Sequence, residues 1–166
     1  DIEFSVNTEI YEDLSKENSS DKYEFILPNF SLSKMLNTGF DGSMEISTFG
    51  YNKLYNTNTN EKILVNNLNY KSQDSIKNSG LINNFEFLFK NFNADSKNSS
   101  NFKNRSENNI RGIFQFNSKF PLKKNGKKYL STLTPIFVAK FNPQNNKNIN
   151  NEERLIDYSN IYSIDR

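Results

Sequence analysis

Long runs in which apolar and polar residues alternate strictly constrain the fold of this chain more than any other feature. In residues 110–120 every second residue is apolar or small, including Phe114 and Phe116, and the residues between them are mostly polar. Side chains of a β-strand point alternately to opposite faces, so this run predicts an amphipathic strand. Asn125-Gly126 follows as a tight turn, after which the alternation resumes. The range 110–143 therefore predicts a β-hairpin whose second arm has about 14 residues, against an ordinary five or six.

The same alternation recurs along most of the chain and predicts an all-β protein. Further strands are expected at 2–15, 22–36, 43–55, 61–72 and 81–95, and residues 161–166 resemble the beginning of another. No segment has a convincing helical period. After Pro28 the alternation shifts by one residue, as expected across a β-bulge. The sequence thus predicts an antiparallel up-and-down β-meander of about seven to eight long strands.

The connections between the expected strands differ in length. Open polar loops are expected after the first, fifth and seventh strands, and the last two of these loops are 96–108 and 143–160. Connections after the second, fourth and sixth strands are compact, about six to eight residues, an alternation typical of outer-membrane barrels with long loops outside and short turns in the periplasm. Asn125-Gly126 is then expected on the periplasmic side. The short turn at 56–60 departs from this pattern.

Composition excludes several classes of function. The chain has no Cys and no His, so thiolate metal sites, disulfides and the commonest general base are missing. With 21 basic and 19 acidic residues the net charge is only +2, which indicates no nucleic-acid partner. No apolar run is long enough for a helical membrane span. Glu152-Glu153 could be imagined as an acid/base pair, but we expect these carboxylates to be solvated. We therefore predict no enzyme activity and no catalytic, cofactor-binding or metal-binding residues.

Several short segments of the sequence resemble the barrel region of the LptD family, the outer-membrane lipopolysaccharide-assembly proteins. The similarity is to Asn- and Lys-rich alphaproteobacterial members and covers about Lys22 to Arg166. In chain order it is carried by YEFILPNFSL, GSMEISTFGYNKLYNTNTNEKILVNNLNYKS, GLINNFEFLFKNFNADSKNSS, LKKNGKKYLSTLTPIFVAKFNP and NIYSIDR.

The resemblance implies a large transmembrane β-barrel in the outer membrane of a Gram-negative bacterium. The partners it implies are lipopolysaccharide, an outer-membrane lipoprotein plug of the LptE type, and periplasmic transport components. The chain lacks the family's jelly-roll segment, signal peptide and cysteines. Residues 1–166 are therefore expected to be one interior, unclosed segment of such a barrel, which contributes to non-catalytic lipid transport by the parent protein.

Several residues allow two interpretations. Phe85, Phe87 and Phe89 form a row that could face lipid, with Asn84, Glu86 and Lys90 toward a polar lumen, or could belong to a soluble sandwich core. Tyrosines near strand ends could form an aromatic girdle or be ordinary; they are Tyr51, Tyr55, Tyr70 and Tyr129.

The remaining features have ordinary explanations. KKNGKK at 123–128 is expected to be a solvated turn rather than a polyanion site. Pro28, Pro121 and Pro135 are expected at bulges or strand ends, although the hydrogen bonds that they remove between strands could also help a barrel wall to open sideways. Sequons at Asn18, Asn98 and Asn104 are expected by chance. The alternative to the barrel is a soluble or secreted β-sheet binding module, such as part of an adhesin or fibre.

Overall fold

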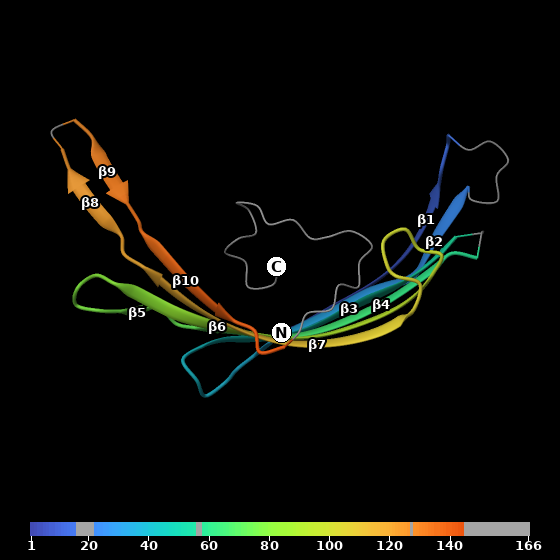
Figure 1. Ribbon diagram of the computed structural model, residues 1–166, viewed down its shortest axis with the longest axis horizontal. Coiled ribbons are helices and arrows are strands. Elements are labelled where there is room, and N and C mark those ends of the chain that lie inside the picture. Colours follow the sequence, from blue (N-terminus) through green and yellow to red (C-terminus); the bar gives the residue numbers. More distant parts are fainter. Residues whose placement is uncertain (16–21, 56–57, 127, 145–166) are drawn as a thin grey trace.

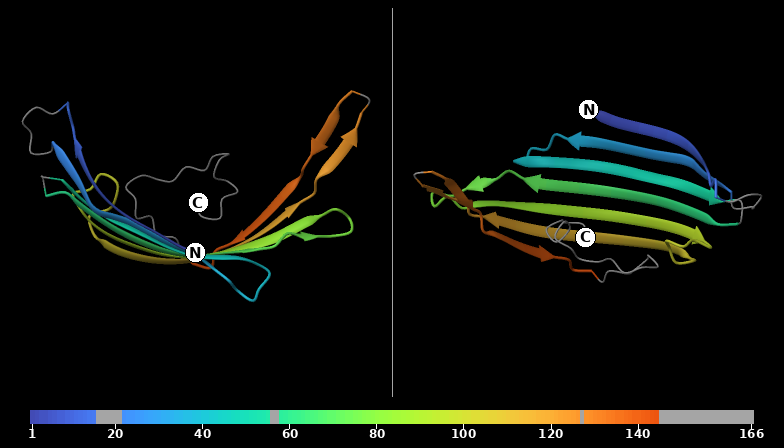
Figure 2. Two further views of the ribbon diagram at one scale, coloured as in Figure 1. Left: turned by 180° about the vertical axis from the view of Figure 1, so that it is seen from behind. Right: turned by 90° about the horizontal axis from the view of Figure 1, so that it is seen from above.

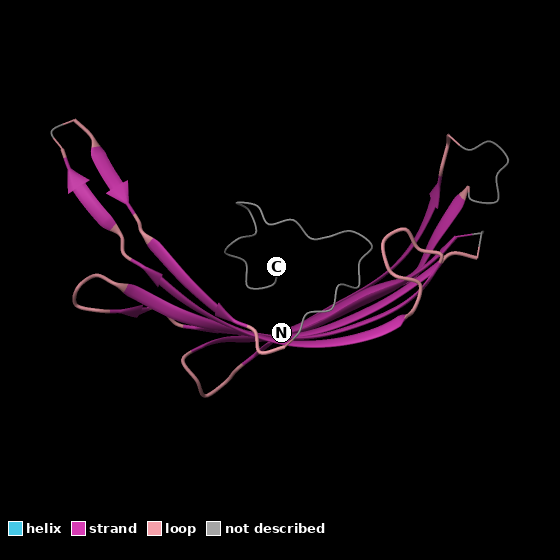
Figure 3. Cartoon of the chain, viewed as in Figure 1, coloured by secondary structure: helices cyan, strands magenta, loops and turns pink. Residues whose placement is uncertain are grey.

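In the computed structural model every regular element among the described residues is a β-strand (Figure 3). The structure describes residues 1–15, 22–55, 58–126 and 128–144. The strands are β1 (Ile2–Glu12), β2 (Tyr23–Leu36), β3 (Gly42–Tyr55), β4 (Asn60–Ser72), β5 (Ser75–Ile76), β6 (Ile82–Lys97), β7 (Ser106–Lys119), β8 (Leu122–Asn125), β9 (Leu130–Leu133) and β10 (Ile136–Phe141). The expected eighth strand at 161–166 lies outside the described residues.

The long strands form one antiparallel sheet in which neighbours in sequence are neighbours in space (Figure 2). The order is β1-β2-β3-β4-β6-β7-β10, with the short β5 paired to β6. This confirms the predicted all-β, up-and-down meander. The sheet is bent into an open arc and is not closed into a barrel, so it has a concave inner face and a convex face (Figure 1).

The connection between β6 and β7 is shorter than the sequence indicates. The polar composition predicts a loop over 96–108, but β6 runs to Lys97 and β7 begins at Ser106. The paired residues Asp95 and Ser106 face each other, and the Ser106 hydroxyl donates a hydrogen bond to Asp95 Oδ1 at 2.6 Å. Cross-strand pairing thus extends the ladder into residues whose polar character alone predicts a loop.

The prediction of one long strand as the second arm of the hairpin is wrong, because two shorter strands, β9 and β10, form this arm. β9 and β10 are separated at Thr134-Pro135, and β7 and β8 are separated at Phe120-Pro121. Proline has no N–H to donate to the ladder, so each proline marks a strand boundary, as expected. The β8–β9 hairpin forms a separate two-stranded sheet, and its turn begins at the predicted Asn125-Gly126.

A bulge interrupts β2 at Pro28, as predicted. The register between β2 and β3 shifts between Ile26 and Asn29, and the register between β1 and β2 shifts between Asn7 and Glu9. The shift keeps Phe25 and Phe30 on the same face, since they pair with Leu54 and Gly50, both even-numbered residues of β3. The bulge therefore corrects the phase of the alternation.

The predicted alternation of long and short connections is wrong. At one end of the sheet the connections are 13–22, 56–59 and 98–105, and at the other end they are 37–41, 73–81 and 120–135, the last containing the β8–β9 hairpin. Each end thus has both short and long connections. Loop length does not mark one end as periplasmic, and the periplasmic side expected for Asn125-Gly126 loses this support.

Candidate functional site

Cross-strand register shows that an apolar band runs across the long strands on the convex face. One row runs through six strands and is apolar at every position: Leu36, Met44, Tyr70, Phe87, Phe114 and Phe141. Inspection of single strands leaves the faces undecided, because several strands have apolar residues on both. Pairing settles the question, since residues directly opposite each other share a face.

This apolar band crosses the strands obliquely. One row of paired residues near the end with the 56–59 connection begins at Ile10 of β1. This row is apolar on β1, β2 and β3, and it is polar on β4 and β6, where its members are Asn60 and Lys97. The row through Val6 is apolar on β1–β4 and polar at Asn93 and Asn108. Toward the opposite end, Phe137 of β10 pairs with Ser118, which pairs with Asn83. The band therefore shifts steadily along the strands from β1 to β10.

A chain of hydrogen-bonded polar side chains crosses the convex face, within the band on β3 and β4 and at its edge on β6 and β7. Its members are Thr48, Asn66, Asn91, Asn93 and Asn108, called the asparagine row below. Thr48 Oγ1 donates to Asn66 Oδ1 at 2.9 Å, and Asn66 Nδ2 donates to Asn91 Oδ1 at 3.2 Å. Asn93 Nδ2 also donates to Asn91 Oδ1, at 2.6 Å, and Asn108 donates to Asn93. These bonds satisfy polar groups across four strands, and on β6 and β7 they lie where apolar residues give way to polar ones.

The inner face is more crowded and more polar. All the buried side chains among the described residues lie on it, and they include polar residues as well as aliphatic ones: Glu61, Ser96, Asn109 and Gln115 beside Ile63, Val65, Leu88, Ala94 and Ile113. Bending toward this face brings its side chains together. The apolar side chains of the convex face remain partly exposed, as with Phe87 at 38 % and Phe114 at 43 %.

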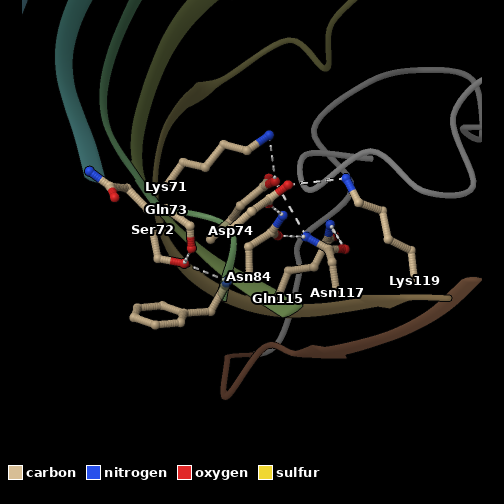
Figure 4. A network of polar contacts seen from close by, with 10 residues as sticks. Lys71, Ser72, Gln73, Asp74, Asn84, Gln115, Asn117 and Lys119 are labelled. Atoms are coloured by element: carbon tan, nitrogen blue, oxygen red, sulfur yellow. Dashed lines mark hydrogen bonds and ion pairs between the residues drawn. The ribbon is translucent and has the colours of Figure 1, made fainter. Parts of the chain in front are cut away.

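A polar network covers the inner face near the 73–81 connection (Figure 4). Asn117 Nδ2 donates to Asn84 Oδ1 at 2.8 Å and to Glu86 Oε1 at 3.3 Å, while Lys71 Nζ lies 3.3 Å from Glu86 Oε1. Asn84 Nδ2 donates to Asp74 Oδ1 at 2.6 Å. The network joins three neighbouring strands and the connection above them.

Asp74 is a carboxyl group of this network whose pKa is lowered by its neighbours. The hydrogen bond from Asn84 is the main cause that lowers the pKa of its carboxyl, and the ammonium of Lys119, 3.2 Å from Oδ2, lowers the pKa further. Both interactions favour the charged form. The side chains of Asp74 and Lys119 are each 43 % exposed, so the pair is an ordinary surface ion pair rather than a catalytic group.

The phenylalanine row is the part of the sequence-based site prediction that the structure places most clearly. Phe85, Phe87 and Phe89 lie on the convex face, and Asn84, Glu86 and Lys90 lie on the inner face. No second layer of the described residues covers the row, and its rings are 38–42 % exposed. The opposed faces agree with the expectation of one apolar and one polar side.

Two of the four tyrosines considered for an aromatic girdle do not lie on the face of the apolar band. Tyr51 and Tyr55 lie on the inner face of β3, where they pair with Ile63 and Glu24. Tyr70 lies on the convex face and donates to the carbonyl of Asp41 at 2.8 Å. Tyr129 is 78 % exposed in the β8–β9 turn. Alternation along β3 shows that Tyr51 shares a face with Phe49 but not which face this is.

KKNGKK lies in the β8–β9 hairpin, whose described lysines are exposed, in accord with a solvated turn. The residues Glu152-Glu153 and Asn18 lie outside the described parts of the chain. No group of three acidic residues in the described ranges is arranged to hold a metal ion. The same ranges contain no helix with the length and hydropathy that a helical membrane span requires.

Comparison with protein-family models, with curated proteins and with solved structures finds no match to this chain.

Proposed function

We propose that this chain is part of the wall of an outer-membrane β-barrel of the LptD type, a translocon that assembles lipopolysaccharide into the outer leaflet without covalent chemistry. The observation that carries the proposal is the oblique apolar band on the convex face, opposed to a polar inner face. A barrel needs this division, because its outside contacts hydrocarbon and its lumen is polar.

The oblique course of the band has a simple geometric origin in a barrel. Strands of membrane barrels are tilted by about 40°, lie about 4.8 Å apart and rise about 3.3 Å per residue, so a level hydrocarbon layer moves by about one residue per strand. The band shifts in this steady manner, from rows that are apolar on β1–β3 to a row that is apolar on β10 alone.

The asparagine row supports the same orientation. An amide that faces hydrocarbon without a partner is costly, and these amides are bonded to one another, within the band on β4 and at its edge on β6 and β7. We place this border at headgroup level. The inner face, with its network of Asn, Lys and Glu, then lines the lumen, where a lipoprotein plug and the polar part of lipopolysaccharide would pass or bind.

The lipopolysaccharide assignment rests on the sequence resemblance. Four of its five segments fall, in chain order, on β2, on the β3–β4 pair, on β6 and on the β8–β10 region, and the fifth, NIYSIDR, lies outside the described residues.

Two single tryptophans test the membrane contact, because the chain contains no Trp. Phe87 and Leu88 are adjacent on β6 and point to the convex and inner faces respectively. In vesicles with brominated acyl chains, we expect strong quenching of tryptophan fluorescence in Phe87→Trp and weak quenching in Leu88→Trp. Equal quenching of both would contradict the barrel orientation. Failure to bind vesicles, with a monomeric and soluble chain, would favour the adhesin or fibre module.

A second experiment tests the transported lipid. Depleting the gene that encodes this chain in its own cells should reduce the lipopolysaccharide that an impermeant reagent labels on intact cells. Slower uptake of small solutes with unchanged surface lipopolysaccharide would indicate a different barrel, such as a porin. An upstream jelly-roll region and further alternating strands in the same reading frame would also support the proposal.

A further inference from the structure

The loop between β6 and β7, residues 98–105 and called the strap below, folds back over the inner face (Figure 1). Phe102 packs against the buried cluster of Ile63, Val65 and Ala94. Its ring also lies 6.3 Å from the ring of Phe92, measured between centroids. The Ser96 hydroxyl donates to the carbonyl of Lys103 at 2.7 Å. The cluster of Ile63, Val65 and Ala94 is the main apolar core among the described residues, and Phe102 of the strap covers one side of this cluster.

Glu61 holds the strap against the inner face by hydrogen bonds. It lies on the inner face of β4 and is only 2 % exposed. Its Oε1 accepts hydrogen bonds from the Ser99 hydroxyl and, at 3.2 Å, from Asn101 Nδ2. A buried carboxylate is costly unless hydrogen bonds satisfy it. Both donors come from the strap, so the strap and the Glu61 carboxylate depend on each other.

The strap also has its own internal turn. The Ser99 hydroxyl oxygen accepts hydrogen bonds from the backbone N–H groups of Asn101 and Phe102, at 3.0 and 3.1 Å. Asn98 has a φ of 55°, in the left-handed region that Asn tolerates, and its side chain donates to the carbonyl of Asn58 at 3.3 Å. Ser99 thus bonds both to Glu61 and to the backbone that carries Phe102, which aims the ring at the sheet.

We infer that the strap is a fixed inward constriction, locked by Glu61, rather than a loop that extends away from the sheet. It covers the apolar patch on the inner face and occupies space on the concave side beside β4 and β6. Any molecule that moves along this face must pass the strap. The inference concerns contacts within the chain and holds whether or not the convex face meets a membrane.

The test uses Phe102→Trp as the only tryptophan of the full chain, in detergent micelles, with acrylamide as the quencher. We expect blue-shifted emission and quenching several-fold weaker than in Phe40→Trp, because Phe40 is 73 % exposed in the 37–41 connection. Adding Glu61→Ala to Phe102→Trp should raise the quenching toward the value measured for Phe40→Trp. Adding Glu61→Gln instead, which keeps an acceptor, should retain part of the protection.

Two controls keep the result specific to the lock. Glu45→Ala removes a carboxylate from the inner face of β3 that bonds to no strap residue, and it should leave the quenching of Phe102→Trp unchanged. Asn101→Ala removes one donor to Glu61 and leaves the turn held by Ser99 in place, so it serves if Glu61→Ala fails to fold by circular dichroism, and it should raise the quenching by a smaller amount. The inference would be overturned if the tryptophan at position 102 were as accessible as the one at position 40. Quenching that does not respond to loss of either the acceptor or the Asn101 donor would also overturn it.

Discussion

Gly50 lies on the convex face of β3, where its neighbours leave no room for a side chain. A Cβ at this position would come within 2.6 Å of the Ile63 carbonyl and 3.1 Å of the Phe30 ring. At Gly112, also on the convex face, a Cβ would meet nothing within 4 Å. Gly50→Ala should lower the free energy of unfolding by about 1–3 kcal/mol through overpacking, whereas Gly112→Ala should not. Urea unfolding of the two variants in detergent measures the difference; equal midpoints would contradict the packing at Gly50.

Asp74 offers a test of the inner polar network. Because its folded-state pKa is lowered, its charge stabilises the fold above the ordinary value of 3.8, and this contribution disappears as the pH falls through the lowered pKa. Removing a cause of the shift should move the pKa back toward 3.8. We expect clear rises in Asn84→Ala, which removes a hydrogen bond, and in Lys119→Met, which removes both a hydrogen bond and a charge, and the smallest rise in Lys71→Met, each followed by carboxyl NMR signals. A larger effect of Lys71 than of Asn84 would show that the network is arranged differently.

At the scale of elements, the β8–β9 hairpin packs against none of the other strands in the described part of the chain. Its two strands are exposed along their whole length. Replacing 121–134 with an Asn-Gly turn should therefore leave the main sheet intact, with an unchanged urea midpoint and β signal in circular dichroism. Loss of the sheet would show that the hairpin supports β7 and β10. Shortening the 98–105 strap is the matched comparison, and it should be destabilising because Phe102 belongs to the apolar core.

Some features of the strands and loops could be predicted from the sequence, and others could not. Period-two alternation locates the long strands, and Pro28 indicates its bulge, because both are local properties of the chain. The true ends of β6 and β7 do not follow from the sequence, since Ser96 and Lys97 become strand residues by pairing with β4, and Ser106 by pairing with Asp95. The inward fold of the strap does not follow from it either. Phe102 in SKNSSNFKNRSEN is the single aromatic residue of a polar stretch, and this is the signal that the sequence contains.

For the whole molecule, the faces of the sheet cannot be assigned strand by strand. Phe49 and Tyr51 give the inner face of β3 aromatic residues that its convex face lacks, and only the register with β4 and β6 identifies the continuous band. The band is a property of seven strands together. Its oblique course is therefore invisible until the pairs are known, even where each strand is located correctly.

The two outer strands of the sheet predict how the isolated chain behaves. Phe4 on β1 is 67 % exposed and Phe141 on β10 is 64 % exposed, against 38 % for Phe87 in the middle of the sheet. Outside detergent or lipid, these open edges should associate. Light scattering should show large assemblies, and Phe4→Lys together with Val6→Lys should reduce their size. A monodisperse monomer that melts cooperatively without detergent would instead support the soluble binding module.

The antiparallel order described above also has a consequence of parity. Seven strands that alternate in direction leave β1 and β10 pointing the same way. A ring in which every neighbour is antiparallel must contain an even number of strands. These seven strands therefore cannot close on one another with antiparallel hydrogen bonds, however strongly the arc is bent. Completing such a ring requires an odd number of additional strands, and the strands that pair with β1 and with β10 must both run opposite to them.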